Sequence, residues 1–129
     1  MNKIFKVGLI GCGHISETYF RAQEYFNNIR IVKCADINMD SAKKCAIHYN
    51  IEALSVEELL KDKEIEIILN LTIPAAHFEV SKLAIESGKH SYAEKPMAVN
   101  FEDGKKLVEL AKEKNLYIGN APDTFLGGG

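Results

Sequence analysis

Two glycines and an aspartate have the types and spacing of a site for phosphate and sugar. Gly11 and Gly13 follow directly on an apolar run at residues 4–10, and Asp36 follows a second apolar run. The first glycine permits a tight turn, and the second lets the backbone approach a phosphate closely. Such motifs have an acidic residue about 20 positions on, which accepts hydrogen bonds from a ribose diol. Asp36 lies 20 residues after Ser16, which replaces the third glycine of the motif. The pattern predicts a dinucleotide site.

A helix is predicted directly behind the two glycines. One apolar face of it is formed by Ile15, Tyr19, Ala22 and Phe26. The N-terminus of such a helix presents backbone N–H groups and a positive dipole end to an anion. We therefore count Gly11, Gly13, His14 and Ile15 as cofactor contacts, with His14 contributing its backbone N–H more than its ring. The alternative is a glycine-rich turn that serves packing alone and holds no ligand.

The remaining sequence alternates between strand and helix patterns. Further strands are predicted at residues 29–35, 51–54, 65–71, 90–93 and 116–118. Apolar residues at helical spacing predict three further helices, with faces formed by Ala42, Cys45, Ala46 and Tyr49, by Ala76, Val80, Leu83 and Ala84, and by Leu107, Leu110 and Ala111. Ser55 to Glu58 is typical of a capping box and predicts a short helix. Alternation of this kind predicts an α/β fold with a doubly wound parallel sheet, the Rossmann fold, with about six strands in the order 3-2-1-4-5-6. The ligand crevice then lies outside the carboxyl ends of the first and fourth strands, where the glycine turn and residues 70–74 should face the cofactor.

Composition excludes several classes of partner. The 129 residues carry a formal net charge of −2, so no basic surface for nucleic acid or an anionic membrane is expected. No apolar run is long enough to span a membrane. The odd number of cysteines, Cys12, Cys34 and Cys45, and their lack of C-x-x-C spacing predict reduced thiols in a cytoplasmic protein, with no disulfide and no metal site.

A second group of motifs resembles a known family. The motifs are Tyr92-Ala93-Glu94-Lys95-Pro96, Thr72-Ile73-Pro74 followed by His77, Ser87-Gly88-Lys89-His90, and the tail at residues 121–129. Together with the glycine turn, and in this order along the chain, they resemble the glucose–fructose oxidoreductase and inositol dehydrogenase family. The Glu-Lys-Pro sequence is the most specific part of the resemblance.

The resemblance implies an NAD(P)-dependent dehydrogenase that acts on the CH–OH group of a sugar, cyclitol or related compound. It implies that Lys95 reaches between nicotinamide and substrate as the catalytic residue. It also implies that Glu94 lies beside the nicotinamide ribose, and that Thr72, Pro74 and His77 lie at the cofactor. Independently of the family, a cation held at a strand end by a following proline can stabilise an oxyanion during hydride transfer. The alternatives are an exposed loop lysine without a role and, for His77, a half-buried histidine in the first turn of its helix.

The resemblance also bears on domain organisation. Residues 1–120 correspond to the dinucleotide-binding domain, and residues 121–129 to the start of a connection to an α+β substrate domain. The sequence is therefore expected to be truncated, to bind cofactor, and to be inactive alone. We expect the parent protein to be a homo-oligomer and this chain to be a monomer.

Cofactor choice and function leave alternatives. Asp36 favours NAD over NADP, because a carboxylate repels a 2′-phosphate and the next residues, Ile37 and Asn38, bring no cation. A regulatory module that binds NAD without turnover is the second hypothesis. An S-adenosylmethionine methyltransferase is the third, but it leaves the Glu-Lys-Pro sequence unexplained.

Overall fold

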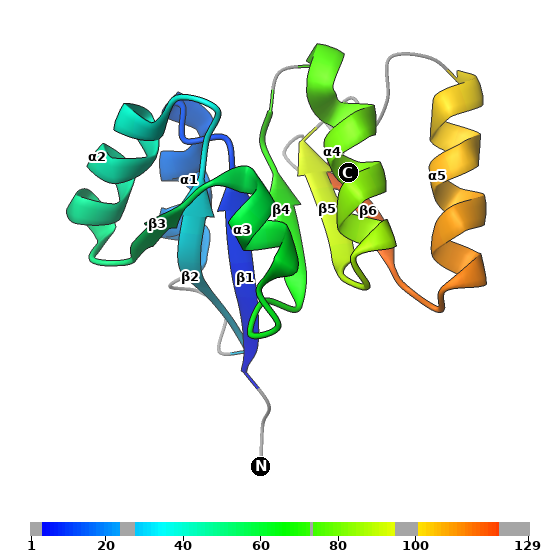
Figure 1. Cartoon of the computed structure of the whole chain (residues 1–129), viewed down its shortest axis with the longest axis horizontal. Helices are drawn as coiled ribbons and strands as arrows, with labels where there is room; N and C mark the ends of the chain where they lie inside the picture. The colour runs from blue at the N-terminus through cyan, green and yellow to red at the C-terminus, as the bar shows by residue number, and fades with distance from the viewer. Residues whose placement is uncertain (1–3, 24–27, 73, 95–100, 122–129) are drawn as a thin grey trace.

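A computed structural model describes residues 4–23, 28–72, 74–94 and 101–121, and within these ranges strands and helices alternate (Figure 1). The elements are β1 (Phe5–Ile10), α1 (His14–Ala22), β2 (Ile29–Ala35), α2 (Met39–Tyr49), β3 (Glu52–Leu54), α3 (Val56–Lys61), β4 (Ile67–Asn70), α4 (Pro74–Glu86), β5 (His90–Glu94), α5 (Phe101–Glu113) and β6 (Ile118–Ala121).

The strands form one six-stranded sheet in the order β3-β2-β1-β4-β5-β6, and all five neighbouring pairs are parallel. This order confirms the predicted doubly wound sheet. It reverses at β1 and β4, so the chain leaves these two strands in opposite directions along the sheet. A crevice between their carboxyl ends is the usual ligand position in such folds.

Helices cover both faces of the sheet. One core cluster joins strand residues such as Leu9 and Leu69 to Phe20 of α1 and to Cys45 and Ala46 of α2. A second cluster, on the other face, joins strand residues to α3 and α4, and a third lies between α4 and α5. Figure 1 shows α3 and α4 in front of the strands. The near-continuous apolar sequences of the inner strands follow from this two-sided burial.

The helix ends follow local chemistry that can be read in the sequence. Ser55 and Glu58 form the predicted capping box at the start of α3. Asn38 caps α2 by accepting hydrogen bonds from the N–H groups of Asp40 and Ser41. Gly88, predicted to end its helix, has φ of +84° and follows α4.

Two sequence predictions about helix packing differ from the structure in detail. Leu83, placed on the inner stripe of its helix, is 38% exposed, whereas Ser81, Ala84 and Ile85 are fully buried. In α1 the buried aromatic residue is Phe20, which stacks on Tyr49 and was not on the predicted face. The helix ends at Ala22, and the predicted face residue Phe26 lies outside the described residues.

The predicted last strand at residues 116–118 is displaced along the chain. β6 begins only at Ile118 and pairs with β5, whereas Tyr117 before it is exposed. The predicted strand at residues 65–71 is shortened at both ends to β4, because Ile65 and Leu71 are buried as flanking residues outside the ladder.

A buried lysine supports the turn opposite the crevice. Lys89 is 5% exposed, and its Nζ donates to the carbonyl oxygens of Asp62 (2.6 Å) and Ile65 (2.9 Å). Burial lowers the pKa of this amine. Lys89 belongs to the Ser-Gly-Lys-His motif of the sequence, and its contacts give that motif a structural role.

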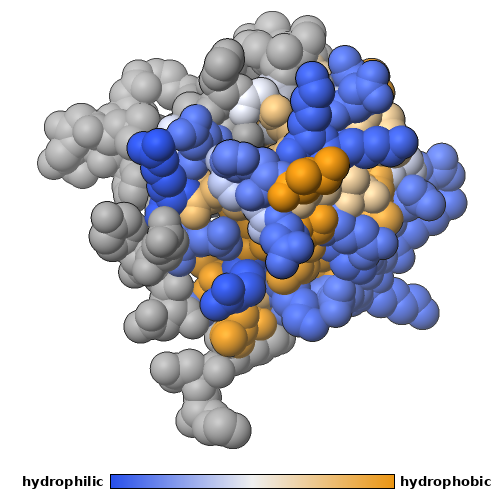
Figure 2. Space-filling view, turned by 90° about the vertical axis from the view of Figure 1, so that its left-hand side faces the viewer, coloured by the Kyte–Doolittle hydropathy of each residue, from blue (hydrophilic) through white to orange (hydrophobic). Residues whose placement is uncertain are grey.

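In the described part of the chain, no helix has the length and apolarity needed to cross a membrane. Figure 2 shows the face at the α2 and β3 edge of the sheet, which is largely hydrophilic with a few hydrophobic side chains. Ile47 of α2 and Ile37 before it are the most exposed large apolar residues described.

Candidate dinucleotide-binding site

The sheet register brings the predicted site segments to one edge. Ile10 at the end of β1 pairs with Ala35 of β2 and with Asn70 of β4, and Asn70 in turn pairs with Ala93 of β5. The residues that follow the first three of these positions leave the sheet side by side, and Glu94, the last residue of β5, lies at the same end of its strand. Gly11, Asp36, Leu71 and Glu94 therefore share one edge, as the predicted crevice requires.

Gly11 is fixed by both its backbone conformation and its surroundings. Its φ is +103°, a region that side chains other than glycine rarely adopt. A Cβ at this position would lie 2.7 Å from the backbone C and O of Leu71. The Gly11 N–H donates to Ala35 O at 2.9 Å, and Leu71 N–H donates to Ile10 O at 2.8 Å. The turn is therefore clamped between the exits of β2 and β4.

Gly13 meets a different environment. It is the N-cap of α1 with φ of −86°, it is exposed, and a Cβ there would meet no atom within 4 Å. No side chain caps this helix end. The protein itself therefore does not require glycine at position 13. The open space is instead what a phosphate group approaching the α1 N-terminus would need.

Asp36 ties the glycine turn to the end of β2. Its Oδ2 accepts the Cys12 N–H at 2.7 Å, and its Oδ1 accepts the Asn38 N–H at 2.9 Å. The side chain is partly exposed. Each carboxylate oxygen has a second lone pair, so both can still accept hydrogen bonds from a sugar diol. Asp36, which is predicted to bind ribose, is thus hydrogen-bonded to the glycine turn.

Ile37 is an exposed apolar residue at this edge to which the sequence analysis gave no contact role. It follows Asp36 and is 90% exposed, the highest exposure of any large apolar side chain described. An isoleucine exposed to water beside the Asp36 carboxylate offers an apolar surface that could pack against a planar ring. The signal in the sequence was an apolar residue placed just beyond the strand that Asp36 ends.

The exit of β4 is held by buried polar side chains. Thr72, a predicted cofactor residue, donates from N–H and Oγ1 to Asn70 Oδ1 at 3.2 and 2.6 Å. Asn70 Nδ2 donates to Ser81 Oγ of α4 at 2.9 Å, and Asn70 and Ser81 are fully buried. Asn70 therefore points into the protein and orients Thr72, and the expectation that the segment 70–74 faces the cofactor stays a prediction.

The other predicted residues are located only through their elements. Pro74 and His77 lie in the first turn of α4, and Glu94 is the last residue of β5. His14 and Ile15 begin α1. Lys95, the predicted catalytic residue, lies outside the described residues. It directly follows Glu94, so the chain enters this segment from the same edge of the sheet as the glycine turn.

The edge combines open space at Gly13, a helix N-terminus, a carboxylate and an exposed apolar side chain. Backbone N–H groups and a positive dipole end bind anions, and a carboxylate binds neighbouring hydroxyl groups. This set suits a ligand with a phosphate group and a sugar diol.

Comparison with known proteins finds a matching family model and similar sequences. The family model described as "Oxidoreductase family, NAD-binding Rossmann fold" matches residues 5–121. A UDP-N-acetylglucosamine 3-dehydrogenase from Acidithiobacillus ferrooxidans is 30% identical over 114 residues, which are 88% of this chain and 35% of that protein. An inositol 2-dehydrogenase from Salmonella typhimurium is 29% identical over 114 residues, 85% of this chain and 34% of that protein.

A solved structure agrees with this fold. A biliverdin reductase from Synechocystis, in complex with biliverdin and NADP+, superposes with a TM-score of 0.82 at 27% identity. The superposition covers 89% of this chain and 37% of that one. The chain thus spans about a third of the length of the curated relatives and of this structure.

Proposed function

The chain belongs to the oxidoreductase family with an NAD-binding Rossmann fold, and from this premise we propose that it binds NAD at the carboxyl edge of its sheet. In this proposal the pyrophosphate lies over Gly11 and Gly13 at the start of α1, with His14 and Ile15 contributing backbone N–H groups. Asp36 accepts hydrogen bonds from the adenosine ribose, and Ile37 packs against adenine.

The hydrogen bond between Cys12 N–H and Asp36 is the observation that carries the proposal. It holds the turn and the carboxylate in fixed relation at 2.7 Å before any ligand arrives. A site organised in advance loses less conformational entropy on binding. The open space over Gly13 lies on the same turn and supports the same assignment.

The charge at Asp36 supports NAD rather than NADP. A 2′-phosphate on the ribose would meet the carboxylate at close range, and the two residues that follow, Ile37 and Asn38, carry no positive charge. We expect NADH to bind more tightly than NADPH. A charge-assisted hydrogen bond contributes about 1.5–3 kcal/mol, so Asp36→Ala should weaken NADH binding by roughly 10- to 100-fold.

Calorimetric titration of the chain with NADH and NADPH tests this assignment. Asp36→Ala should reduce or reverse the preference for NADH. Asp40→Asn, an exposed acid at the start of α2, is the matched control and should leave both affinities within about twofold. Tighter binding of NADPH by the unmutated chain would contradict the proposed role of Asp36.

We further propose that the parent protein is a dehydrogenase of a sugar, cyclitol or other polyol, since two of its relatives carry the names of such enzymes. Residues 1–120 would form its dinucleotide-binding domain, with substrate specificity supplied by sequence outside this chain, in the cytoplasm. When bound, the nicotinamide would supply hydride transfer. Thr72, Pro74, His77 and Glu94 would line the cofactor, and Lys95 would bind the reacting hydroxyl group.

The role of Lys95 is tested in a protein that carries the further length of its relatives. Lys95→Ala should lower kcat by about 10²-fold or more and change the Kd of NADH by less than about threefold, because the ammonium group would act mainly in the transition state. Lys82→Ala on α4, the control, should change neither. An unchanged kcat in Lys95→Ala would remove Lys95 from the mechanism.

A further inference from the structure

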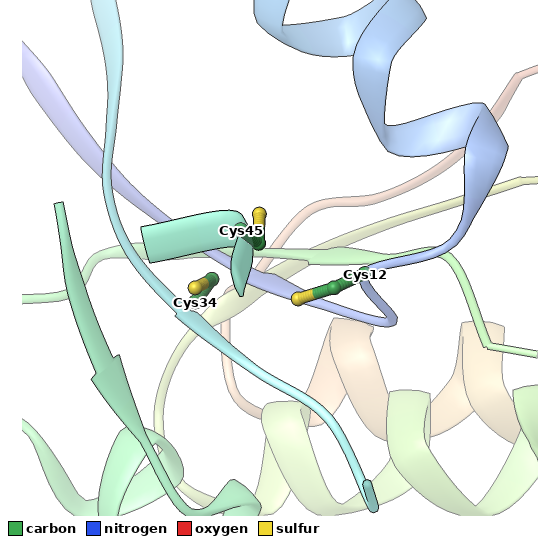
Figure 3. Close-up of side chains that lie close together, drawn as sticks. All are labelled: Cys12, Cys34 and Cys45. Carbon is green, nitrogen blue, oxygen red and sulfur yellow. The ribbon is translucent and has the colours of Figure 1, made fainter. Parts of the chain in front are cut away.

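Three thiols that are far apart in the sequence converge beneath the glycine turn. Cys12 lies in the turn between β1 and α1, Cys34 in β2 and Cys45 in α2, and all three are free. Their Sγ atoms lie within 4.8 Å of one another. Figure 3 shows Cys12 pointing from its turn toward the other two cysteines. The cluster was not predicted, because the linear spacing of the three residues fits no metal-binding motif.

The fold brings each thiol to this point by a separate device. The β1–β2 register shifts between Val7, which pairs with Ile31, and Gly8, which pairs with Lys33. The shift leaves Val32 between the paired positions, and Ile31 and Cys34 both belong to the core cluster under α1 and α2. Cys45 belongs to the inner stripe of α2, and Cys12 packs against the same cluster.

We propose that Cys12, Cys34 and Cys45 together bind one thiophilic d¹⁰ metal ion, Cu(I), through three thiolates. Thiolates are soft ligands that select Cu(I), zinc and iron–sulfur clusters over harder ions. Three sulfur atoms that each lie about 2.3 Å from one ion are roughly 4 Å from one another. Each pair of Sγ atoms would therefore need to move closer by less than about 1 Å to bind the ion. Binding releases thiol protons to solvent and changes no oxidation state.

The composition of the cluster favours Cu(I) over Zn(II). Structural zinc is almost always four-coordinate. Among the described residues, no histidine or carboxylate ligand atom joins this group of three sulfurs. His48 lies on the same helix but is exposed and packs edge-on against Tyr49. Three sulfur ligands without a fourth suit a trigonal ion.

Burial and access are also suitable. Cys34 is fully buried and Cys45 is 8% exposed, so a bound ion would be shielded from water. Cys12 is partly exposed at the turn and gives an ion a way in. The Sγ atoms of Cys12 and Cys34 also donate to the carbonyl oxygens of Ala35 (3.5 Å) and Ala42 (3.4 Å), contacts that orient both thiols in the absence of metal.

Anaerobic competition with a chromogenic Cu(I) chelator tests the proposal. The reduced chain should withdraw one equivalent of Cu(I) and develop a sulfur-to-copper charge-transfer band in the ultraviolet. Cys12→Ser, at the partly exposed turn, should weaken Cu(I) binding by at least about tenfold, and so should Cys34→Ala. His48→Ala is the matched control and should leave affinity and stoichiometry unchanged. Circular dichroism identifies the variants that retain the fold.

The outcomes separate a built site from adventitious binding. Loss of binding in a folded Cys12→Ser variant, with His48→Ala unaffected, supports a three-thiolate site. Equal Cu(I) affinity in the parent chain and in Cys12→Ser, weakened binding in His48→Ala, or tighter binding of Zn(II) than of Cu(I) would each overturn the proposal. NADH plays no part in this experiment, so its result is independent of dinucleotide binding.

Discussion

At the scale of single residues, the two glycines of the turn serve different purposes. Gly11 is required by the protein, because its φ is +103° and a Cβ would overlap the backbone of Leu71. Gly13 has an ordinary φ and open space around its missing Cβ. Folding therefore explains the first glycine, and the proposed contact with a phosphate group would explain the second.

Alanine substitutions should separate the two roles. Gly11→Ala should destabilise the fold by roughly 2–4 kcal/mol, from backbone strain and overlap with the β4 exit. Gly13→Ala should cost at most about 1 kcal/mol, the effect of a poorer N-cap, but should weaken NADH binding by at least about tenfold. Urea unfolding and NADH titration measure the two effects. Tight NADH binding by Gly13→Ala would contradict the phosphate assignment.

At this scale the sequence could place residues together where a local pattern links them. Gly11 and Asp36 could be found because their spacing reflects the length of one strand–helix–strand unit. Asn70 was missed, because a fully buried amide becomes intelligible only when Ser81 and Thr72 are seen to pair with it. The thiol cluster was missed for the same reason, since it depends on a register shift that no sequence spacing reveals.

At the scale of elements, the mispredicted positions are those where neighbouring apolar residues offer two possible buried faces or strand starts. In α4 both Leu83 and Ala84 fit an apolar inner stripe. In the structure Ala84 and Ser81 are buried, and the Ser81 hydroxyl accepts a hydrogen bond from Asn70. The last strand was placed on the apolar residues 116–118, but pairing with β5 begins only at Ile118. Hydrophobic periodicity identified each element, and tertiary contacts set its face and its first residue.

The connection from α3 to β4 carries the ion pair that should govern stability in acid. Asp62 pairs with Lys33 of β2, and both side chains are 17% exposed. The Lys33 ammonium lowers the pKa of Asp62 below its ordinary value of 3.8, and Asp62 raises the pKa of Lys33. A carboxyl group whose pKa is lowered by folding stabilises the folded state at pH values above its ordinary pKa. This stabilisation is lost as the pH falls below the ordinary pKa and through the lowered one.

We therefore expect the free energy of unfolding to decline below about pH 4. Asp62→Asn should lower it by about 1–3 kcal/mol at neutral pH and should make the decline in acid much smaller. Glu57→Gln breaks an exposed pair with Lys61 and should cost less than about 0.5 kcal/mol. Urea unfolding at pH 3 to 7 gives the comparison. An acid limb as steep in Asp62→Asn as in the parent chain would show that other carboxyl groups control it.

At the scale of the whole molecule, the alternation of strand and helix patterns in the sequence is enough to predict the topology. Strand, helix and short connection repeat along the chain, and right-handed crossovers leave few arrangements for such a sequence. The observed strand order and the family match confirm that inference and the resemblance drawn from the motifs. Substrate choice had no comparable signal, because the chain spans only about a third of the length of its relatives.

Binding at the carboxyl edge should stabilise the whole fold, since the ligand would join the exits of β1, β2 and β4. At an NADH concentration 100 times its Kd, linkage adds about 2.7 kcal/mol to the free energy of unfolding. For a chain of this size that corresponds to a rise in Tm of roughly 10 °C. Scanning calorimetry with and without NADH measures it, and Gly13→Ala, which binds NADH at least about tenfold more weakly, should show at most about half of this rise at the same NADH concentration. Equal shifts in both proteins would mean that NADH binds elsewhere, away from the glycine turn.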